Sequence, residues 1–304
     1  MKNKKILITG STGFVGRGLV NELIKKKNVI LYLILNKKKL RFKSKNIKLI
    51  NCSLKNKKIL KKKLALVDIN YVIHCAWVGV DANNRNSNKQ KQNLKIINNI
   101  FEALENKKLN CFIGIGSQAE YGRKKKVIYE TSKLNPNSNY GKIKVRVHNK
   151  IKKYCKLKKI RFVWLRIFTG YGPGSSNKWL IPYTITNILS NKNIIKFTSG
   201  KQIYNFIYIS DITIAIIKSL FNININGEYN LAFKISYKIK TVINLIFSIL
   251  KTKSIPNFGK IEYRSDQSMN FFPSISKLKK DFKWEPKIGI KQGLKKNIMY
   301  LKKF

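Results

Sequence analysis

The chain has 304 residues, 43% of them apolar, which is enough to bury the core of one large domain or of two closely joined ones. Its 64 Lys and Arg residues outnumber 13 Asp and Glu residues, giving a formal net charge of +51. The lysines are spread along the chain together with many Asn and Ile residues, which favours a bias of composition over a dedicated nucleic-acid surface. Two histidines, and four cysteines without a C-x-x-C pair, argue against a metal site and a disulfide framework.

The apolar runs are too short for a signal-peptide core or a membrane span. The longest, Val29–Leu35, has the length of a strand. We therefore expect a cytoplasmic protein that does not associate with a membrane.

A glycine-rich loop joins the first predicted strand to the first predicted helix. The β-like run at 4–9 is followed by Gly10-Ser-Thr-Gly13-Phe-Val-Gly16, and apolar residues then recur with helical spacing from Leu19 to Ile24. Glycines at this spacing permit a tight turn and a close approach of the backbone to pyrophosphate, and the start of a helix offers free N–H groups to phosphate. The loop therefore predicts a dinucleotide-binding site.

The second predicted strand, Val29–Leu35, ends without an acidic residue. Dinucleotide-binding folds often place an acid there to bind the adenosine ribose. Here Asn36 and Lys37 open a basic run, and Arg17 directly follows the glycine loop. Cations suit the additional phosphate of NADP, so we expect NADP as the preferred cofactor, with NAD as the alternative.

Strand-like runs continue to alternate with helical patterns as far as Ile167. Strands are expected at 47–51, 71–76, 111–115 and 159–167, and an amphipathic helix at 89–105. This alternation predicts an α/β fold with a doubly wound parallel sheet of the Rossmann type. His74, among apolar neighbours in the fourth strand, is predicted to be packed and hydrogen-bonded rather than catalytic.

Three polar residues follow the fifth predicted strand. Ser117 comes just after it, where ligands bind in such sheets. Tyr140 lies further along, and Lys144 follows it by four residues, which is one helical turn. An ammonium group next to a phenol lowers the phenol's pKa, so this pair predicts an acid/base that works near neutral pH.

The clean alternation ends after the turn cluster Gly170–Gly174, which predicts a smaller C-terminal α/β substrate-binding domain. We expect a dinucleotide-binding domain at 1–165 and a mainly substrate-binding region at 166–304, with 201–220 returning to the first domain.

The ordered motifs resemble the extended short-chain dehydrogenase/reductase family, which comprises nucleotide-sugar epimerases, dehydratases and ketoreductases. The matching segments are TGSTGFVG at 9–16, YVIHCAW at 71–77, GSQAEYG at 116–122, YGKIK at 140–144, RIFTGYGPG at 166–174, QIYNFIYISD at 202–211 and DFKWEPKIGIKQGL at 281–294. The resemblance covers nearly the whole chain, and it implies an NAD(P)-dependent enzyme that acts on a nucleotide-activated sugar.

The resemblance also assigns roles to residues. Tyr140 would exchange a proton with a sugar oxygen, Lys144 would hold the nicotinamide ribose and lower the pKa of the tyrosine, and Ser117 would hydrogen-bond the same oxygen. The implied cofactor-binding residues are Gly10, Thr12, Gly13, Phe14, Val15, Gly16, Arg17, Asn36, Lys37, Ala76, Tyr140 and Lys144. The implied substrate-binding residues are Ser117, Gln118, Thr169 and Arg264, the last on the nucleotide diphosphate.

Departures from the family pattern narrow the expected reaction. Gln118 and Ala119 stand where related 4,6-dehydratases carry an Asp-Glu pair, and Ala119 stands where related epimerase–reductases carry a cysteine. The remaining expected reaction is hydride transfer at C4, catalysed by either a 4-ketoreductase or a 4-epimerase. Ser53 and Thr169 replace a usual Asp and a frequent Asn of the binding sites.

The alternative function is a non-catalytic dinucleotide-binding protein that associates with nucleic acid through its charge. An intact Ser117, Tyr140 and Lys144 set favours the enzyme. The resemblance further implies a homodimer formed through helices near 90–105 and 140–155.

Overall fold

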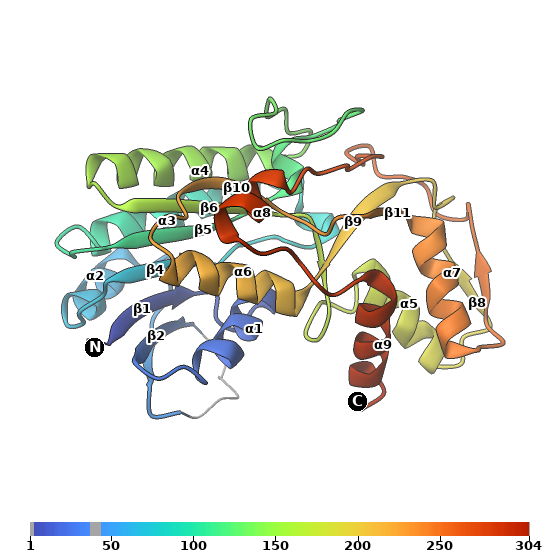
Figure 1. The fold of residues 1–304 in the computed structure, drawn as a ribbon, viewed down its shortest axis with the longest axis horizontal. Helices are drawn as coiled ribbons and strands as arrows, with labels where there is room; N and C mark the ends of the chain where they lie inside the picture. The colour runs from blue at the N-terminus through green and yellow to red at the C-terminus, as the bar shows by residue number, and fades with distance from the viewer. Residues whose placement is uncertain (1–2, 37–43, 304) are drawn as a thin grey trace.

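A seven-stranded sheet forms the centre of the N-terminal region in the computed structural model, which describes residues 3–36 and 44–303 (Figure 1). The strand order is β10-β6-β5-β4-β1-β2-β3, and every pair is parallel. The strands are β1 (Lys4–Thr9), β2 (Val29–Leu35), β3 (Ile47–Asn51), β4 (Tyr71–His74), β5 (Cys111–Ser117), β6 (Arg161–Ile167) and β10 (Gly227–Leu231). The predicted Rossmann-type sheet is confirmed, and its order reverses between β1 and β4, where such sheets bind ligands.

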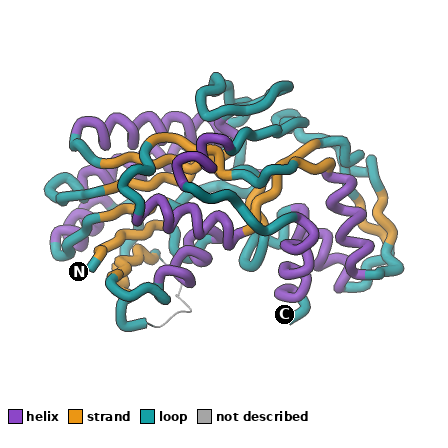
Figure 2. Tube along the Cα trace, viewed as in Figure 1, coloured by secondary structure: helices purple, strands orange, loops and turns teal. Residues whose placement is uncertain are grey.

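Helices cover both faces of this sheet (Figures 1 and 2). One face carries α2 (Lys57–Ala65), α3 (Gln92–Ala103) and α4 (Asn139–Leu157), and the other carries α1 (Phe14–Leu23), α6 (Ile209–Phe221) and α8 (Ser276–Phe282). Alternate residues of a strand point to opposite faces, so Ile6 and Ile8 pack with one hydrophobic cluster and Leu7 with the other. Both faces of the sheet are therefore buried, as parallel sheets require.

The second region lies to the right in Figure 1 and contains smaller sheets. One has the order β11-β9-β7, and the other pairs β8 with β12. Its elements are β7 (Thr169–Tyr171), α5 (Leu180–Leu189), β8 (Ile194–Lys196), β9 (Ile203–Tyr208), β11 (Ser236–Lys238), α7 (Ile239–Leu250), β12 (Ile255–Asn257) and α9 (Ile290–Leu301). Three short 3-10 helices, η1 (Ala82–Asn84), η2 (Asn88–Lys91) and η3 (Gln118–Glu120), lie in the loops after β4 and β5.

The chain returns to the first region over a longer stretch than the predicted 201–220. Helix α6 packs on α1, and β10 then pairs with β6, with Tyr229 opposite Leu165. Strand β6 itself continues to Ile167, two residues beyond the predicted boundary at 165. The sequence pattern missed this return because β10 is a single short strand whose partner lies far away in the sequence.

Among residues 3–36 and 44–303, no helix combines the length and the apolar character needed to cross a bilayer. Within the same ranges, no cluster of His, Cys, Asp or Glu side chains is arranged to hold a metal ion.

Asp211 ties the C-terminal segment to the first region. It lies in the first turn of α6, is 1% exposed, and accepts hydrogen bonds from the backbone N–H groups of Lys287 (3.1 Å) and Ile288 (2.8 Å). The segment that leads into α9 is thereby held against a helix of the dinucleotide-binding region.

Replacing Asp211 with alanine should lower the free energy of unfolding by about 1–3 kcal/mol, because two backbone donors lose their acceptor. Urea denaturation measures this loss. Asp68→Ala is the matched control, since Asp68 forms an exposed ion pair with Lys5 and its removal should change stability little. Equal losses in both variants would contradict the role of Asp211.

Candidate active site

A cavity of about 820 Å³ opens at the carboxyl ends of the central strands. Its walls come from the loops after β1, β4 and β5, from the start of α4, and from the segment near Arg264. Every described residue predicted for cofactor or substrate binding lines it, and Lys37 lies outside the described residues. The lining members of that predicted set are Gly10, Thr12, Gly13, Phe14, Val15, Gly16, Arg17, Asn36, Ala76, Ser117, Gln118, Tyr140, Lys144, Thr169 and Arg264.

The glycine loop leaves room at one end of the cavity. Gly10 has φ +71°, and a Cβ there would lie 2.6 Å from the backbone nitrogen of Ala76, so only glycine fits between the loops after β1 and β4. Ser11 Oγ and Arg17 Nε are buried without a hydrogen-bond partner among the described residues. A close backbone approach together with unsatisfied donors at the start of α1 fits a dinucleotide pyrophosphate.

Arg17 bridges the two halves of the protein. Its guanidinium carbon lies 3.5 Å from the position a Cβ of Gly174 would take, in the turn after β7. We predicted that Arg17 helps to bind the additional phosphate of NADP; in this structure Arg17 lines the cavity together with Asn36 and also packs against the turn after β7.

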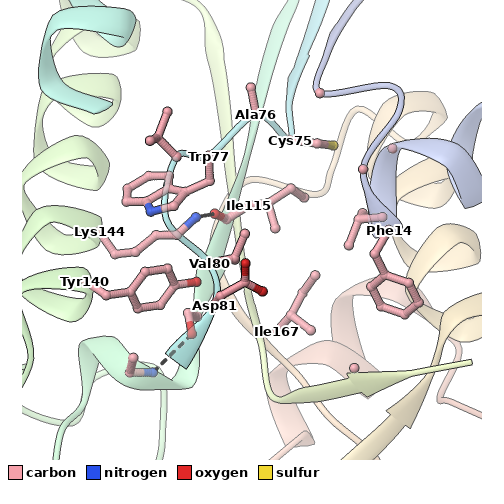
Figure 3. A pocket seen from close by; sticks show the side chains of 18 of the residues that line it. Phe14, Cys75, Ala76, Trp77, Val80, Asp81, Ile115, Tyr140, Lys144 and Ile167 are labelled. Carbon is pink, nitrogen blue, oxygen red and sulfur yellow. Dashed lines mark hydrogen bonds between the residues drawn. The ribbon is translucent and has the colours of Figure 1, made fainter. Parts of the chain in front are cut away.

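Tyr140 and Ser117 meet at the centre of the cavity. Ser117 ends β5 and caps η3, with its side chain accepting a hydrogen bond from Ala119 N–H at 3.2 Å. Tyr140 lies in the first turn of α4, as predicted, and is 6% exposed. Figure 3 shows its phenol pointing into the cavity, opposite Phe14 of α1. Burial raises the pKa of Tyr140, while nearby Arg85 and a hydrogen bond with Ser117 oppose this increase.

Lys144 lies near the tyrosine but is directed elsewhere. Its Nζ donates to the Ile115 carbonyl at 2.6 Å and lies 3.6 Å from the centre of the Trp77 ring, against 5.8 Å for the Tyr140 ring. Burial lowers the pKa of Lys144 to about 7. In this structure the cation that opposes the effect of burial on the Tyr140 pKa is Arg85, and the role of Lys144 in lowering that pKa stays a prediction.

The predicted substrate residues Gln118, Thr169 and Arg264 line the same cavity as Ser117. Gln118 Nε2 donates to Thr169 Oγ1 at 3.4 Å, and Gln118 Oε1 is buried with no partner in the described part of the chain. Arg264 is exposed, and its Nε donates to Asp266 at 2.9 Å. The unpaired Gln118 oxygen can accept a hydrogen bond from a ligand hydroxyl, and the exposed Arg264 guanidinium suits an anionic group of a ligand.

The charged and aromatic lining residues that the sequence analysis did not assign include Trp77, Asp81, Arg85 and Asp266. The first three follow β4, a strand next to the switch point, so their position after that strand was the available signal. Asp81 brings a carboxylate into the wall of the cavity that also contains Tyr140 (Figure 3). Asp266 carried no local signal, since it belongs to an irregular segment.

His74 is a structural residue, as predicted. It is buried, its Nδ1 lies 2.8 Å from Thr9 Oγ1, and burial lowers its pKa to about 3. The imidazole is therefore neutral and holds β4 to β1.

A buried carboxylate supports Ser117 from behind. Glu120 is fully buried and accepts hydrogen bonds from Ser117 N–H (2.8 Å), the Trp164 indole (3.1 Å) and Arg166 Nε (2.9 Å). Arg166 Nη1 also donates to the Tyr121 hydroxyl at 2.9 Å. The end of β5 is thus fixed to β6 by a charged network.

Comparisons with known proteins all identify relatives in one enzyme family. The model of the NAD dependent epimerase/dehydratase family matches residues 6–232. The protein named uncharacterized UDP-glucose epimerase YtcB, from Bacillus subtilis (strain 168), is 28% identical over 311 residues, which cover 98% of each chain. The UDP-glucuronate 4-epimerase of Thermodesulfobacterium geofontis (strain OPF15) is 28% identical over 328 residues, covering 97% of this chain and 95% of the relative.

A solved structure agrees in fold over the same length. The UDP-glucuronic acid 4-epimerase from Bacillus cereus, in complex with UDP-glucuronic acid and NAD, is similar with a TM-score of 0.87 at 26% identity. The similarity covers 98% of this chain and 99% of that chain.

Replacing Glu120 with alanine should lower the free energy of unfolding by about 3–5 kcal/mol, because Arg166 would stay buried without its carboxylate. Urea denaturation measures this change. Glu285→Ala, which removes an exposed ion pair with Lys279, is the control and should have little effect. A Glu120→Ala protein as stable as the control would contradict the network.

Proposed function

The chain belongs to the NAD dependent epimerase/dehydratase family, and on this basis we propose that it transfers hydride at C4 of a nucleotide-activated sugar. It acts either as a 4-epimerase or as a 4-ketoreductase. One observation carries the proposal: Ser117, Tyr140 and Lys144 converge in a cavity that also contains the dinucleotide loop. A protein that only bound a dinucleotide would not need this set.

Tyr140 is the residue that transfers the proton. As the phenolate it takes the proton of the sugar C4 alcohol during oxidation, and as the phenol it returns a proton during reduction, while the Ser117 hydroxyl hydrogen-bonds the same sugar oxygen. Lys144 would hold the ribose of the nicotinamide, and the glycine loop with Arg17 would hold the pyrophosphate. The nicotinamide, when bound, supplies and accepts the hydride.

Water elimination is disfavoured in this site. A 4,6-dehydratase needs an acid and a base beside Ser117, and Gln118 and Ala119 hold those positions. Asp81 brings a carboxylate to the cavity from another loop, and Asp266, the second lining carboxylate, is paired with Arg264. The chemistry of Asp81 suits accepting a hydrogen bond from a sugar hydroxyl.

The sugar carrier is a nucleoside diphosphate. Arg264 offers a guanidinium suited to bidentate contact with phosphate oxygens. The relatives named above are called UDP-glucose and UDP-glucuronate epimerases, so UDP-sugars are the first substrates to test.

The remaining partner proposals follow the family resemblance. The protein forms a homodimer through α3 and α4, acts in the cytoplasm, and needs no nucleic acid. Light scattering that gives a monomer at every concentration would contradict the dimer. A short duplex that stays tightly bound at about 0.2 M salt would instead favour the nucleic-acid alternative, because simple phosphate attraction weakens steeply there.

Tyr140→Phe should reduce turnover by about 10²–10⁴-fold, because the proton acceptor is lost. Epimer formation from UDP-glucose or UDP-glucuronate is followed by chromatography, and reduction of a nucleotide 4-keto-6-deoxyhexose by NADPH absorbance. Dinucleotide affinity, measured by calorimetry, should stay close to that of the wild type. Tyr129→Phe, at a half-exposed tyrosine outside the cavity, is the control. Full activity of Tyr140→Phe would remove the acid/base assignment.

We further propose that NADP is preferred over NAD, because β2 ends at Leu35 and is followed by Asn36 rather than by an acidic residue. The affinity for NADPH should exceed that for NADH by about tenfold or more, the scale of one charge-assisted hydrogen bond. The difference should shrink at high salt. Calorimetric titration and identification of any co-purified dinucleotide measure it. Tightly held NAD in the purified protein would contradict the preference and would favour the epimerase.

A further inference from the structure

Arg85 contacts Tyr140 in two separate ways. It follows η1 in the loop after β4, and its carbonyl accepts a hydrogen bond from Tyr140 N–H at 2.7 Å, which fixes the start of α4. Its guanidinium carbon also lies over the Tyr140 ring, 4.4 Å from the ring centre. One residue therefore sets both the position of the tyrosine and the charge on the face of its ring.

The charge of Arg85 is only partly neutralised by its surroundings. Its Nε lies 3.8 Å from Asp266 Oδ2, beyond hydrogen-bond distance, and has no hydrogen-bond partner in residues 3–36 and 44–303. The other carboxylate oxygen of Asp266 accepts from Arg264 at 2.9 Å. Asp266 thus pairs with two guanidinium groups. The positive charge of Arg85 is therefore not fully neutralised, and it acts on Tyr140.

The other charges around Tyr140 come from several elements. Glu120 of η3 is buried behind Ser117 and raises the pKa of Tyr140, and Asp81 lines the same cavity. Lys144, on α4 itself, is directed to Ile115 and Trp77. Lys89 and Lys91 of η2, which also packs on α4, are exposed.

Two cations near the site differ in how they respond to pH. The pKa of Lys144 is lowered to about 7 by burial, so its charge fades as the pH rises above neutrality. An arginine side chain stays protonated throughout this range. In this pocket the permanent positive charge beside the phenol is that of Arg85.

We propose that Arg85 is a positioning residue for Tyr140, which holds the phenol at the start of α4 and stabilises its phenolate through the guanidinium on the ring face. A cation over an aromatic ring is attracted by its π-electrons, and the attraction grows when deprotonation places negative charge on the ring. The inference rests on the proposed function, because it assumes that Tyr140 transfers the proton. It adds to the Ser117, Tyr140 and Lys144 set a residue that supports the phenolate where Lys144 is neutral.

The test reads the titration of Tyr140 directly, without any sugar nucleotide. The protein is labelled with tyrosine carrying ¹³C at the ring carbon that bears the hydroxyl, and the Tyr140 signal is the one absent in Tyr140→Phe. Arg85→Gln should raise the apparent pKa of Tyr140 by about one pH unit or more, the scale expected when a charge within 4–6 Å is removed. The Tyr140 pKa of Arg85→Lys should lie between those of the wild type and Arg85→Gln, since lysine keeps a cation but loses the planar contact.

The matched control is Arg146→Gln, which removes the same charge from an exposed position further along α4 and should leave the titration unchanged. If Arg85→Gln does not fold, as judged by circular dichroism, Arg85→Lys alone decides, because its Tyr140 pKa must still exceed that of the wild type. An unchanged pKa in the folded variants, or a wild-type Tyr140 that does not titrate before the protein unfolds in base, overturns the proposal. Absence of turnover with every sugar nucleotide would instead overturn the proposed function and leave this titration readable.

Discussion

The buried ion pair between Glu120 and Arg166 is the constraint on which the active-site geometry depends. Both side chains are nearly inaccessible, so neither charge is tolerable without the other. Glu120 fixes the backbone of Ser117, and Arg166 reaches Tyr121, whose hydroxyl donates to Asn230 of β10 at 2.6 Å. Three adjacent strands are therefore locked together directly behind the serine.

This network also shapes the electrostatics of the cavity. The negative charge of Glu120 opposes the burial that drives Lys144 toward neutrality, and it acts against ionisation of Tyr140. The carboxylate thus favours a protonated lysine and a protonated phenol. Arg85, whose guanidinium lies over the Tyr140 ring, has the opposite effect on the phenol. Two charges of opposite sign therefore act on Tyr140: Arg85 favours the phenolate and Glu120 the protonated phenol.

The sequence was sufficient to predict those features of the site that follow from the order of strands and helices along the chain. The glycine loop, Ser117 at the end of β5, and Tyr140 with Lys144 one turn apart are set by strand–helix alternation, and parallel strands bring their carboxyl ends to one edge. These residues share one cavity as predicted. Loop conformation decided the rest: Asp81 and Arg85 enter the site through the path of the chain around η1, which no periodicity encodes.

Burial accounts for the main difference at the reacting residues. Spacing alone made Lys144 the neighbour that tunes Tyr140, but spacing does not report where an ammonium group points. The packing of Trp77 beside α4 gives the ammonium an aromatic face, and the Ile115 carbonyl gives it an acceptor. Both partners come from strands and loops distant in sequence.

The pairing of β10 with β6 affects how this protein can be made. During synthesis β6 leaves the ribosome long before its neighbour, and it remains an open edge until Leu231 has emerged. The hydrogen bonds that Asp211 accepts from Lys287 and Ile288 form later still, after these two residues have been synthesised. The dinucleotide-binding region therefore cannot be completed as an independent unit on the nascent chain. Until β10 has emerged, the edge of β6 is open to association with other strands.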